Sequence, residues 1–456
     1  MAGHAGGRIM VAAPASGGGK TTFTCGLLRS LQRRGLAVTA GKCGPDFIDP
    51  MFHEHVVGVP SLNLDLFLSD EAHITQLIAE RSYAADIMVI EGVMGFYDGI
   101  GLTDKASSYE VARKTKTPVL LVVDCKGRAL SVCAEVLGMW AVRPDAPLAA
   151  VVLNRVSPAL YPEFKRVIEE ECGVSVLGYI PQVPEVSLTS RHLGLVGAHE
   201  VAHLSDKINK LADVLDTTLD LEGISKLAAS APALHAAAPV ANRVCDHDVT
   251  IAVARDDAFC FYYQEALDTL VHMGAKLQEF SPIHDRELPE NTSALYLGGG
   301  YPELHALALE ANESMRNAVA RAISSGMPTI AECGGFLYLH KTLEDAEGIS
   351  RAMAGVFDAR AYKTEHLRRF GYVTLKAHGD SLLARAGEEI RAHEFHYWES
   401  EDPGQDFIAV KPSNNKTWSC IHATPTLYAG FPHLNLAAYP DVAARFVTAA
   451  SRYSAR

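Results

Sequence analysis

The stretch APASGGGKTT, residues 13–22, decides the fold of the first half of the chain. It follows the apolar run RIMVAAP, residues 8–14, and precedes a helical pattern that Gly35 closes. Glycines at such a strand-to-helix turn let backbone N–H groups and the start of the helix face phosphate oxygens. We therefore predict a phosphate-binding loop in which Lys20 reaches the β- and γ-phosphates of a nucleotide and the Thr21 hydroxyl is available to Mg²⁺.

This loop departs from the strict spacing Gly-x4-Gly-Lys-Thr, which would place a glycine at Pro14. Its opening turn must therefore differ from that of the common phosphate loop. The positions that carry the chemistry are retained, and we predict that six residues bind the nucleotide: Gly17, Gly18, Gly19, Lys20, Thr21 and Thr22. A flexible glycine turn without a ligand is the alternative, and the strand and helix on its two sides argue against it.

Short β-rich runs alternate with longer helical patterns through the rest of the first half. These runs show little polar alternation, as expected for strands that are covered on both faces. The pattern predicts an α/β fold with a doubly wound parallel sheet. The runs are LAVTAGKC (36–43), DIMVIEG (86–92), PVLLVVDC (118–125), LAAVVLN (148–154) and VLGYIP (176–181).

A segment rich in alanine and proline, residues 223–247, interrupts this rhythm without strand periodicity. We predict that it is a linker between a first domain, 1–222, and a second domain, 248–456. The α/β rhythm restarts after it, so the second domain is also expected to contain a parallel sheet. Its predicted strands are VTIAVARD (249–256), AKLQEFSP (275–282), SALYLGGG (293–300) and PTIAEC (328–333).

Carboxylates follow two predicted strands of the first domain. GKCGPDFIDP supplies Asp46 and Asp49 together with Lys42, and DIMVIEGVMGFYDG supplies Glu91 and Asp98. The carboxyl edge of an open α/β sheet is where ligands bind, and Mg²⁺ prefers carboxylates, water and phosphate oxygens. A single carboxylate after a strand is more often a turn or helix cap. Glu91 is harder to explain in that way, because four apolar residues precede it.

Cys333 lies between the apolar stretch MPTIA and the helical pattern GGFLYLHKTL, so the predicted geometry is strand, tight turn, helix. A thiol at a helix N-terminus has its thiolate stabilised by the dipole, and we expect the pKa of Cys333 to be lowered. An isolated cysteine is more often a small buried apolar residue. Other stretches of the sequence are therefore needed to choose between these two interpretations.

Two further stretches favour a nucleophilic Cys333. ALYLGGGYPELHA, residues 294–306, ends a strand in three glycines, whose N–H groups can approach an oxyanion together with that of Gly334. YAGFPHLNLAAYP, residues 428–440, delivers His433 after a turn, where it can act as a general base. The combination of glycine loop, cysteine and histidine within one domain is much more specific than any one member.

Composition limits the class of protein. The chain has 456 residues, 48% hydrophobic and 21% charged, with a formal net charge of −13, which favours a globular protein over a nucleic-acid or anionic-membrane binder. Its nine cysteines include no Cys-x-x-Cys pair, so we expect reduced thiols and a cytoplasmic location. Because no apolar run approaches the roughly 20 residues of a membrane span, we expect neither export nor membrane insertion.

These stretches together resemble the cobyrinic acid a,c-diamide synthase family, the glutamine-dependent amidases of corrinoid biosynthesis, over essentially the whole chain. The matching stretches are ASGGGKTT, GKCGPDFIDP, VIEGVMGFYDG, NRV, SRHLGLV, YLGGGYPELHA, AECGGFLYL, HEFHYWES and PHLNLAAYP. The resemblance implies an N-terminal ATP-binding domain similar to dethiobiotin synthetase and a C-terminal class I glutamine amidotransferase domain.

The resemblance also implies roles for individual residues. Cys333 would form the γ-glutamyl thioester, and His433 would move the proton. The remaining implied roles concern the oxyanion loop (Gly299, Gly300, Tyr301 and Gly334), the adenine (Asn154), Mg²⁺ (Thr21, Asp46 and Glu91) and the macrocycle (Lys42, Asp46, Ile48, Glu91, Asp98, Arg191 and His192). For Arg191 and His192, a capped helix entry is the alternative interpretation.

The implied reaction is that of a carbon–nitrogen ligase with glutamine as amido donor. ATP would phosphorylate a carboxylate of a tetrapyrrole, and ammonia released from L-glutamine would displace the phosphate. The a and c carboxylates of cobyrinic or hydrogenobyrinic acid would be amidated in turn, in cobalamin biosynthesis. ATP and Mg²⁺ are thus the expected co-substrate and cofactor, no nucleic acid or membrane is involved, and a homodimer is an assembly that the prediction leaves open.

The chain departs from the wider amidotransferase pattern at two positions. Ala331 stands where a glycine usually begins the turn, and Asn435 stands where many triads carry a glutamate two residues after the histidine. The site therefore resembles a Cys/His dyad, and the group that orients His433 is left open.

Other enzymes and one other class of protein are alternatives. Sister amidases, namely cobyric acid synthase or a nickel-sirohydrochlorin a,c-diamide synthase, share both domains, although PDFIDP and HEFHYWES fit the a,c-diamide group better. A P-loop switch ATPase would have no use for Cys333 and His433. In HEFHYWES, residues 393–400, period-2 alternation favours a strand over a metal site. Arg368 and Arg369 are expected on a solvated face, with binding of a substrate carboxylate as the alternative.

Overall fold

The computed structural model describes residues 6–183, 198–234, 243–367 and 369–455. The chain forms two compact units, Met1–Ala238 and Pro239–Arg456.

The first unit is built on a seven-stranded sheet in which every pairing among the described residues is parallel, in the order β3-β2-β4-β1-β5-β6-β7. The predicted parallel sheet is thus confirmed. All six predicted strands are present, and the short strand β3 is an addition. The bounds are β1 Gly7–Ala12, β2 Val38–Cys43, β3 Ser61–Leu64, β4 Ile87–Glu91, β5 Val119–Asp124, β6 Leu148–Asn154 and β7 Ser175–Ile180.

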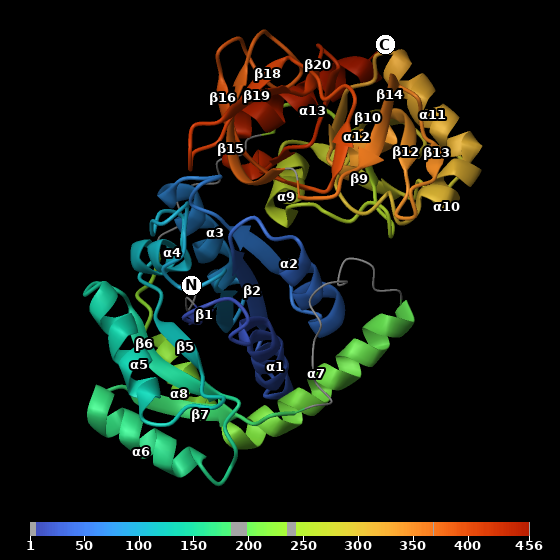
Figure 1. The fold of residues 1–456 in the computed structure, drawn as a ribbon. Helices are drawn as coiled ribbons and strands as arrows, with labels where there is room; N and C mark the ends of the chain where they lie inside the picture. The colour runs from blue at the N-terminus through green and yellow to red at the C-terminus, as the bar shows by residue number, and fades with distance from the viewer. Residues whose placement is uncertain (1–5, 184–197, 235–242, 368, 456) are drawn as a thin grey trace. The chain divides into compact units, whose positions relative to one another are not determined.

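Helices cover both faces of this sheet, which explains why its strands are apolar on both sides. One face packs against α1, α7, α8 and the short π-helix η1, and Figure 1 shows α7 running beside α1. The other face packs against α3, α4, α5 and α6. The bounds are α1 Lys20–Arg33, α2 Ile48–Phe52, η1 His53–Val57, α3 Glu71–Tyr83, α4 Ser108–Lys114, α5 Ser131–Val142, α6 Tyr161–Cys172, α7 Ala198–Thr218 and α8 Leu221–Ala229.

The strand order reverses at β1, which lies between β4 and β5. Loops that leave neighbouring strands in opposite directions open a crevice at the carboxyl edge of the sheet, where ligands bind in open α/β folds. The loops after β1, β2 and β4 carry the predicted phosphate loop, Asp46 and Glu91. The fold therefore gathers these three parts of the sequence at one edge.

The predicted linker, 223–247, begins inside a helix. Leu221, Ile224 and Ala228 of α8 are buried in the core of the first unit. Their spacing of three and four residues marks one helix face, a pattern that the alanine-rich composition obscured. The first unit therefore extends through α8, and the linker prediction needs this correction. Residues 235–242 lie outside the described residues.

The second unit contains a six-stranded sheet in the order β20-β21-β11-β10-β8-β9, parallel except for the β20–β21 pair. The four strands predicted here are confirmed. The strands are β8 Val249–Ala254, β9 Ala275–Phe280, β10 Thr292–Leu297, β11 Thr329–Glu332, β20 His422–Ala423 and β21 Leu427–Gly430. The helices of this unit are α9 Gln264–His272, α10 Ala306–Ala311, α11 Glu313–Ser324, α12 Gly334–Tyr338 and α13 Pro440–Ser454.

Two smaller sheets of this unit were not predicted. One is mixed, in the order β13-β12-β14-β17, and the other is antiparallel, in the order β19-β18-β15-β16-β22. The strands are β12 His340–Glu344, β13 Ser350–Ala352, β14 Phe357–Lys363, β15 Arg369–Ala377, β16 Glu389–His396, β17 Trp398–Ser400, β18 Phe407–Val410, β19 Thr417–Cys420 and β22 His433–Leu434.

The alternation predicted for HEFHYWES is confirmed in β16, where Glu394 and His396 are buried and Phe395 is exposed. The solvated face predicted for Arg369 is wrong. Its guanidinium lies over the Trp418 ring, 4.9 Å from the ring centre, and its side chain is only 22% exposed. Stacking on an aromatic ring explains this burial. Arg368 lies outside the described residues.

Within the described part of the chain, no helix is long and apolar enough to cross a membrane.

Candidate active sites

The predicted phosphate loop connects β1 to α1 with two glycines in the left-handed region. Gly17 has a φ of 76° and Gly19, the N-cap residue of α1, has a φ of 93°. A Cβ on Gly19 would lie 2.4 Å from Nδ2 of Asn154, so a side chain there would also clash. The loop therefore requires glycine for its turn and for its close contact with β6.

Lys20 points back into this loop. Its Nζ donates to the carbonyl of Ala15 at 3.2 Å and to that of Met94. Burial, together with the Lys42 ammonium, lowers the pKa of Lys20 to about 8, although carboxylates of the cluster described next oppose this shift. An anionic ligand would replace these neutral carbonyl partners with an opposite charge.

Glu91 ends β4 and is fully buried. Its Oε1 accepts from the Thr21 hydroxyl at 2.6 Å and from Lys42 Nζ at 3.0 Å, and its Oε2 lies 3.0 Å from Nε2 of His53. Burial alone would raise the pKa of Glu91, but the Lys42 ammonium and His53 lower it below its ordinary value. Glu91, at the end of β4, thus joins the start of α1 to β2 and η1.

Asp49 is the second carboxylate of this cluster. It lies at the start of α2, 8% exposed, where it accepts from Lys42 Nζ and lies 3.5 Å from the Thr21 hydroxyl. Burial and the neighbouring Glu91 raise the pKa of Asp49 well above its ordinary value. The sequence offered both Asp46 and Asp49, and the resemblance implied Asp46 for Mg²⁺, whereas the structure places Asp49 beside Thr21.

Asp46 instead caps α2, because its Oδ1 accepts from the backbone N–H of Ile48 at 2.8 Å. Ile48 packs against the core. Asp98 stabilises a turn by accepting from the N–H of Gly95 at 2.9 Å. These two carboxylates take the cap and turn roles that most carboxylates after strands have.

His53 and Ser61 complete the cluster and were not found from the sequence. Nδ1 of the fully buried His53 lies 3.2 Å from the Ser61 hydroxyl, so its two ring nitrogens have different partners. His53 lies in η1 and Ser61 in β3, two elements that the sequence did not reveal. The sequence around each of these two residues contains no pattern that indicates a contact with Glu91.

Asn154 ends β6 and its Nδ2 donates to the carbonyl of Gly18 at 2.9 Å. The structure therefore places it against the phosphate loop. Arg191 and His192, predicted to bind the macrocycle, lie outside the described residues.

The arrangement of oxygens suits Mg²⁺. Thr21 Oγ1, Glu91 Oε1 and Asp49 Oδ2 converge, and Mg²⁺ favours one or two carboxylates combined with phosphate oxygens and water. A metal cage built from three or more His, Cys, Asp or Glu side chains is absent from the described residues. The site thus has the donors for an ion that a nucleotide would help to hold.

Cys333 occupies a sharp turn between β11 and α12. Its φ of 48° and ψ of −99° are unusual for a residue with a side chain, and its N–H donates to the carbonyl of Gly430 at 2.8 Å. The predicted strand, turn and helix are all present. The expected lowering of the pKa is wrong, because burial and the Glu303 carboxyl raise the pKa of Cys333. A proton acceptor is therefore needed.

Glycines bring the predicted oxyanion loop against this turn. A Cβ on Gly334 would lie 2.9 Å from the backbone nitrogen of Gly300, and a Cβ on Gly299 would lie 2.4 Å from Cε1 of His433. Thus Cys333, the glycine loop and His433 converge on one place. Tyr301, also predicted in the oxyanion loop, donates its backbone N–H to the carbonyl of Ala258 at 2.9 Å. This N–H therefore stabilises the loop.

His433 lies in β22 and is almost fully buried. Burial, together with His393 and His396, lowers the pKa of His433 to about 3, so the ring is neutral at physiological pH and able to accept a proton. Asn435, at the usual place of a triad glutamate, donates to Glu265 at 2.9 Å and accepts from the N–H of Ala437. Asn435 thus has structural partners, and a different carboxyl, that of Glu332, approaches the imidazole, with 3.8 Å between Oε2 and Nδ1.

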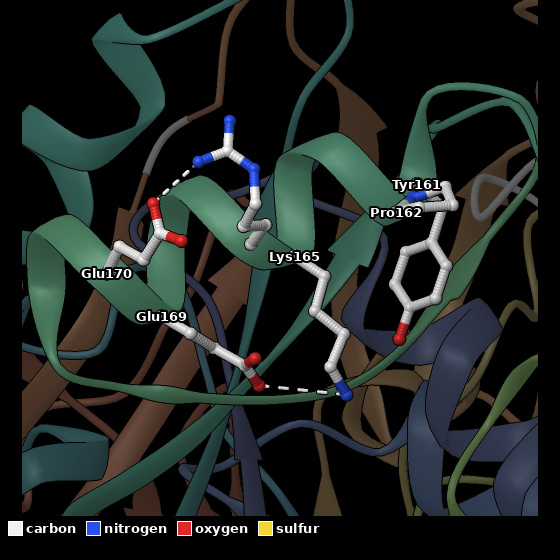
Figure 2. Close-up of a pocket in the computed structure, with 6 residues that line it drawn as sticks. Tyr161, Pro162, Lys165, Glu169 and Glu170 are labelled. Atoms are coloured by element: carbon white, nitrogen blue, oxygen red, sulfur yellow. Dashed lines mark hydrogen bonds and ion pairs between the residues drawn. The ribbon is translucent and has the colours of Figure 1, made fainter.

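Figure 2 shows a pocket away from these residues, on α6, where ion pairs join Lys165 to Glu169 and Arg166 to Glu170. Exposed pairs of this kind stabilise a helix modestly and are common on surfaces. No predicted site residue lines this pocket.

Buried titratable groups around Cys333 predict how stability depends on pH. Burial raises the pKa of Glu303 and Glu394 to about 7 and that of Glu332 to about 8, from an ordinary value of 4.5. A carboxyl group whose pKa is higher in the folded state contributes to the free energy of unfolding. This contribution is fully present below about pH 4.5 and is lost as pH rises through 7 to 8. The buried histidines have lowered pKa values, so their contribution is complete above about pH 6.5.

We therefore expect the unfolding free energy of the second unit to fall by about 3 kcal/mol between pH 6.5 and 8.5. Thermal and urea unfolding of the full chain over this range would measure it. Glu394→Gln should make the fall smaller, because the amide does not titrate. A stability that stays level or rises over the range would contradict the prediction.

Each half of the chain matches a known domain family. Residues 9–196 match the CobQ/CobB/MinD/ParA nucleotide binding domain, and residues 250–439 match the CobB/CobQ-like glutamine amidotransferase domain. A cobyrinate a,c-diamide synthase of Caldanaerobacter subterraneus is 39% identical over 449 residues, which cover 98% of each chain. The chain belongs to the cobyrinate a,c-diamide synthase family.

Other members of this family are similarly close. The Salmonella typhimurium cobyrinate a,c-diamide synthase is 38% identical over 97% of this chain and 98% of its own. The relative of the same name from Thermoplasma volcanium is 39% identical over 98% of both chains. The two matched domains place Lys20, Thr21 and Glu91 in the nucleotide-binding part of a family member and Cys333 and His433 in its amidotransferase part.

Proposed function

We propose that the protein catalyses the ATP- and glutamine-dependent amidation of the a and c side-chain carboxylates of cobyrinic or hydrogenobyrinic acid. One observation carries this proposal. A chain whose full length matches relatives named cobyrinate a,c-diamide synthase holds a phosphate loop joined to buried carboxylates and a separate Cys–His site. Such a pair of sites is what a ligase needs to release ammonia and to activate an acid.

Activation of the acid takes place at the first site. A carboxylate is a poor electrophile, so its oxygen attacks the γ-phosphorus of ATP and forms an acyl phosphate and ADP. Lys20 and the N–H groups of the glycine loop stabilise the charge of the transferring phosphoryl group. Mg²⁺, held by Thr21 and Glu91 with Asp49 or Asp46, would neutralise phosphate charge when bound.

The second site releases ammonia. The Cys333 thiol attacks the side-chain amide carbon of glutamine while His433 takes its proton, and the N–H groups of the glycine loop stabilise the oxyanion. His433 then returns the proton to the leaving nitrogen, which departs as ammonia and leaves a γ-glutamyl thioester. Water hydrolyses this thioester to glutamate and regenerates the thiol.

Ammonia then displaces phosphate from the acyl phosphate and forms the amide. Each amidation therefore converts one ATP and one glutamine to ADP, phosphate and glutamate. Two such cycles give the diamide. The reaction needs ATP at the first site and glutamine at the second, which explains why one polypeptide carries both sites.

The predicted macrocycle-binding residues divide into two groups. Lys42 and Glu91 form a buried ion pair, so we assign them to ordering the phosphate loop. We keep Asp46, Ile48 and Asp98, with Arg191 and His192, as the candidate contacts of the substrate. We further propose the reducing cytoplasm as the compartment, because the nine cysteines, all within the described ranges, are free thiols, and a homodimer remains a proposed assembly.

Mass spectrometry of the purified protein with ATP, glutamine and a candidate acid tests this function. Cobyrinic acid or hydrogenobyrinic acid should undergo two acid-to-amide conversions, each with a fixed mass change and each requiring ATP. Nickel-sirohydrochlorin and the a,c-diamide itself serve as parallel substrates. Conversion of either of these in place of the first two acids would assign the protein to a sister amidase.

A further inference from the structure

Glu332 is the last residue of β11 and directly precedes Cys333. It is 2% exposed. Its Oε1 accepts from the backbone N–H of Leu434 at 2.9 Å, and its Oε2 accepts from the hydroxyl of Tyr296 at 3.3 Å. These two donors fix the carboxyl group between β10 and β22, where a buried carboxylate needs partners.

The same Oε2 faces the catalytic imidazole. It lies 3.8 Å from Nδ1 of His433, and both side chains are almost fully buried. The other ring nitrogen, Nε2, and the carbon between the two nitrogens, Cε1, lie against the glycine loop, 3.3 Å and 2.4 Å from where Gly299 would carry a Cβ. The ring therefore has one nitrogen toward Glu332 and the other toward the place where the glycines and the Cys333 turn meet.

Resting on the proposed function, we propose that Glu332 is the positioning residue of His433, holding the imidazole in the tautomer that carries its proton on Nδ1. The ionised carboxylate accepts that N–H, which leaves the lone pair of Nε2 free to take the proton of the Cys333 thiol. Many triads orient the imidazole with a glutamate two residues after the histidine. Here Glu332, the residue before the nucleophile, has that role.

The protonation state of Glu332 makes this role dependent on pH. Burial raises the pKa of Glu332 to about 8, while the Leu434 N–H and the Tyr296 hydroxyl favour the ionised form. A protonated Glu332 would donate to Nδ1 and so place the ring proton on Nε2, the wrong nitrogen for a base. The other titratable groups facing His433 are His393 and His396 of β16, both neutral because burial lowers their pKa values.

Glu332→Gln tests the proposal, because the amide keeps the shape and can donate to Nδ1. We expect kcat for glutamine hydrolysis to fall about 10²- to 10⁴-fold with little change in KM, as wrong-tautomer variants of catalytic triads do. The pH profile should lose the rising limb near pH 8. Amidation with added ammonia should be unchanged, because it bypasses the thiol site.

Controls separate positioning from a general loss of a buried carboxyl. Glu344→Gln removes a carboxyl from β12 of the same unit, 18% exposed and paired with Arg360, and should keep glutamine hydrolysis within about threefold. Tyr296→Phe removes a donor to Glu332 and should move the rising limb to higher pH. This second variant decides the matter should Glu332→Gln fail to fold.

Two results would overturn the inference. One is a Glu332→Gln protein that hydrolyses glutamine at a near-normal rate with an unchanged pH profile. The other is a Tyr296→Phe protein whose profile does not move. Either result leaves the proposed function standing, whereas loss of ammonia-dependent amidation in the unsubstituted protein would be a failure of that function instead.

Discussion

A Cys333→Ala protein is expected to lose glutamine-dependent amidation by about 10⁴-fold or more, because the thiol forms the covalent intermediate and no other group can replace it. Amidation with ammonium salts at alkaline pH should persist, since free ammonia can attack the acyl phosphate directly. Parallel assays with glutamine and with ammonia, each followed by mass spectrometry of the macrocycle and by glutamate release, would measure both effects.

Cys420→Ala is the matched control for this substitution. Cys420 is a buried thiol of the same unit, in β19. The proposed mechanism gives it no role. It should retain both activities, with only the modest destabilisation that a small cavity causes. If Cys333→Ala turned over glutamine at the normal rate, the amidotransferase assignment of Cys333 would be lost.

A Lys20→Met protein is expected to show the complementary defect. Removal of a charge that stabilises phosphoryl transfer should lower amidation about 10²- to 10³-fold, with glutamine and with ammonia alike. Glutamine hydrolysis at the thiol site should continue at its basal rate, measured without ATP or acid. Release of ADP and of glutamate, assayed separately, would distinguish the two sites.

Lys165→Met provides the control for loss of a lysine from the first unit. Lys165 lies on α6 in an exposed pair with Glu169, so its replacement should leave amidation within about twofold. Equal activity of Lys20→Met and the unsubstituted protein would exclude Lys20 from phosphate binding and would undermine the ATP-dependent step.

Much of the fold could be predicted because its central strands are locally distinctive. Buried parallel strands are continuous apolar runs, and all ten predicted strands of the two central sheets are present. The composition of the glycine-rich stretch after β1 and of the residues around Cys333 was enough to predict two strand-to-helix turns. Short or half-polar elements such as β3 and the antiparallel strands after α12 lack such a signal, and α8 was concealed by its alanines.

The candidate sites were predictable only where sequence and spacing carry the chemistry. Lys20, Thr21, Glu91, Cys333 and His433 were named from the sequence, and the structure places Thr21 against Glu91 and brings the Cys333 turn and His433 to the same glycine loop. The roles of Asp49, His53 and Glu332 depend on strand order, which places residues far apart in the chain side by side. No local pattern could have shown that Glu332 faces His433, one hundred residues later.

The backbone of Cys333 has a price for the molecule as a whole. A φ of 48° with a ψ of −99° costs a residue with a Cβ roughly 1–3 kcal/mol, whereas glycine adopts it freely. A Cys333→Gly chain is therefore expected to lose this backbone strain together with the thiol. The elbow is thus a local cost that the thiol of the proposed mechanism would offset.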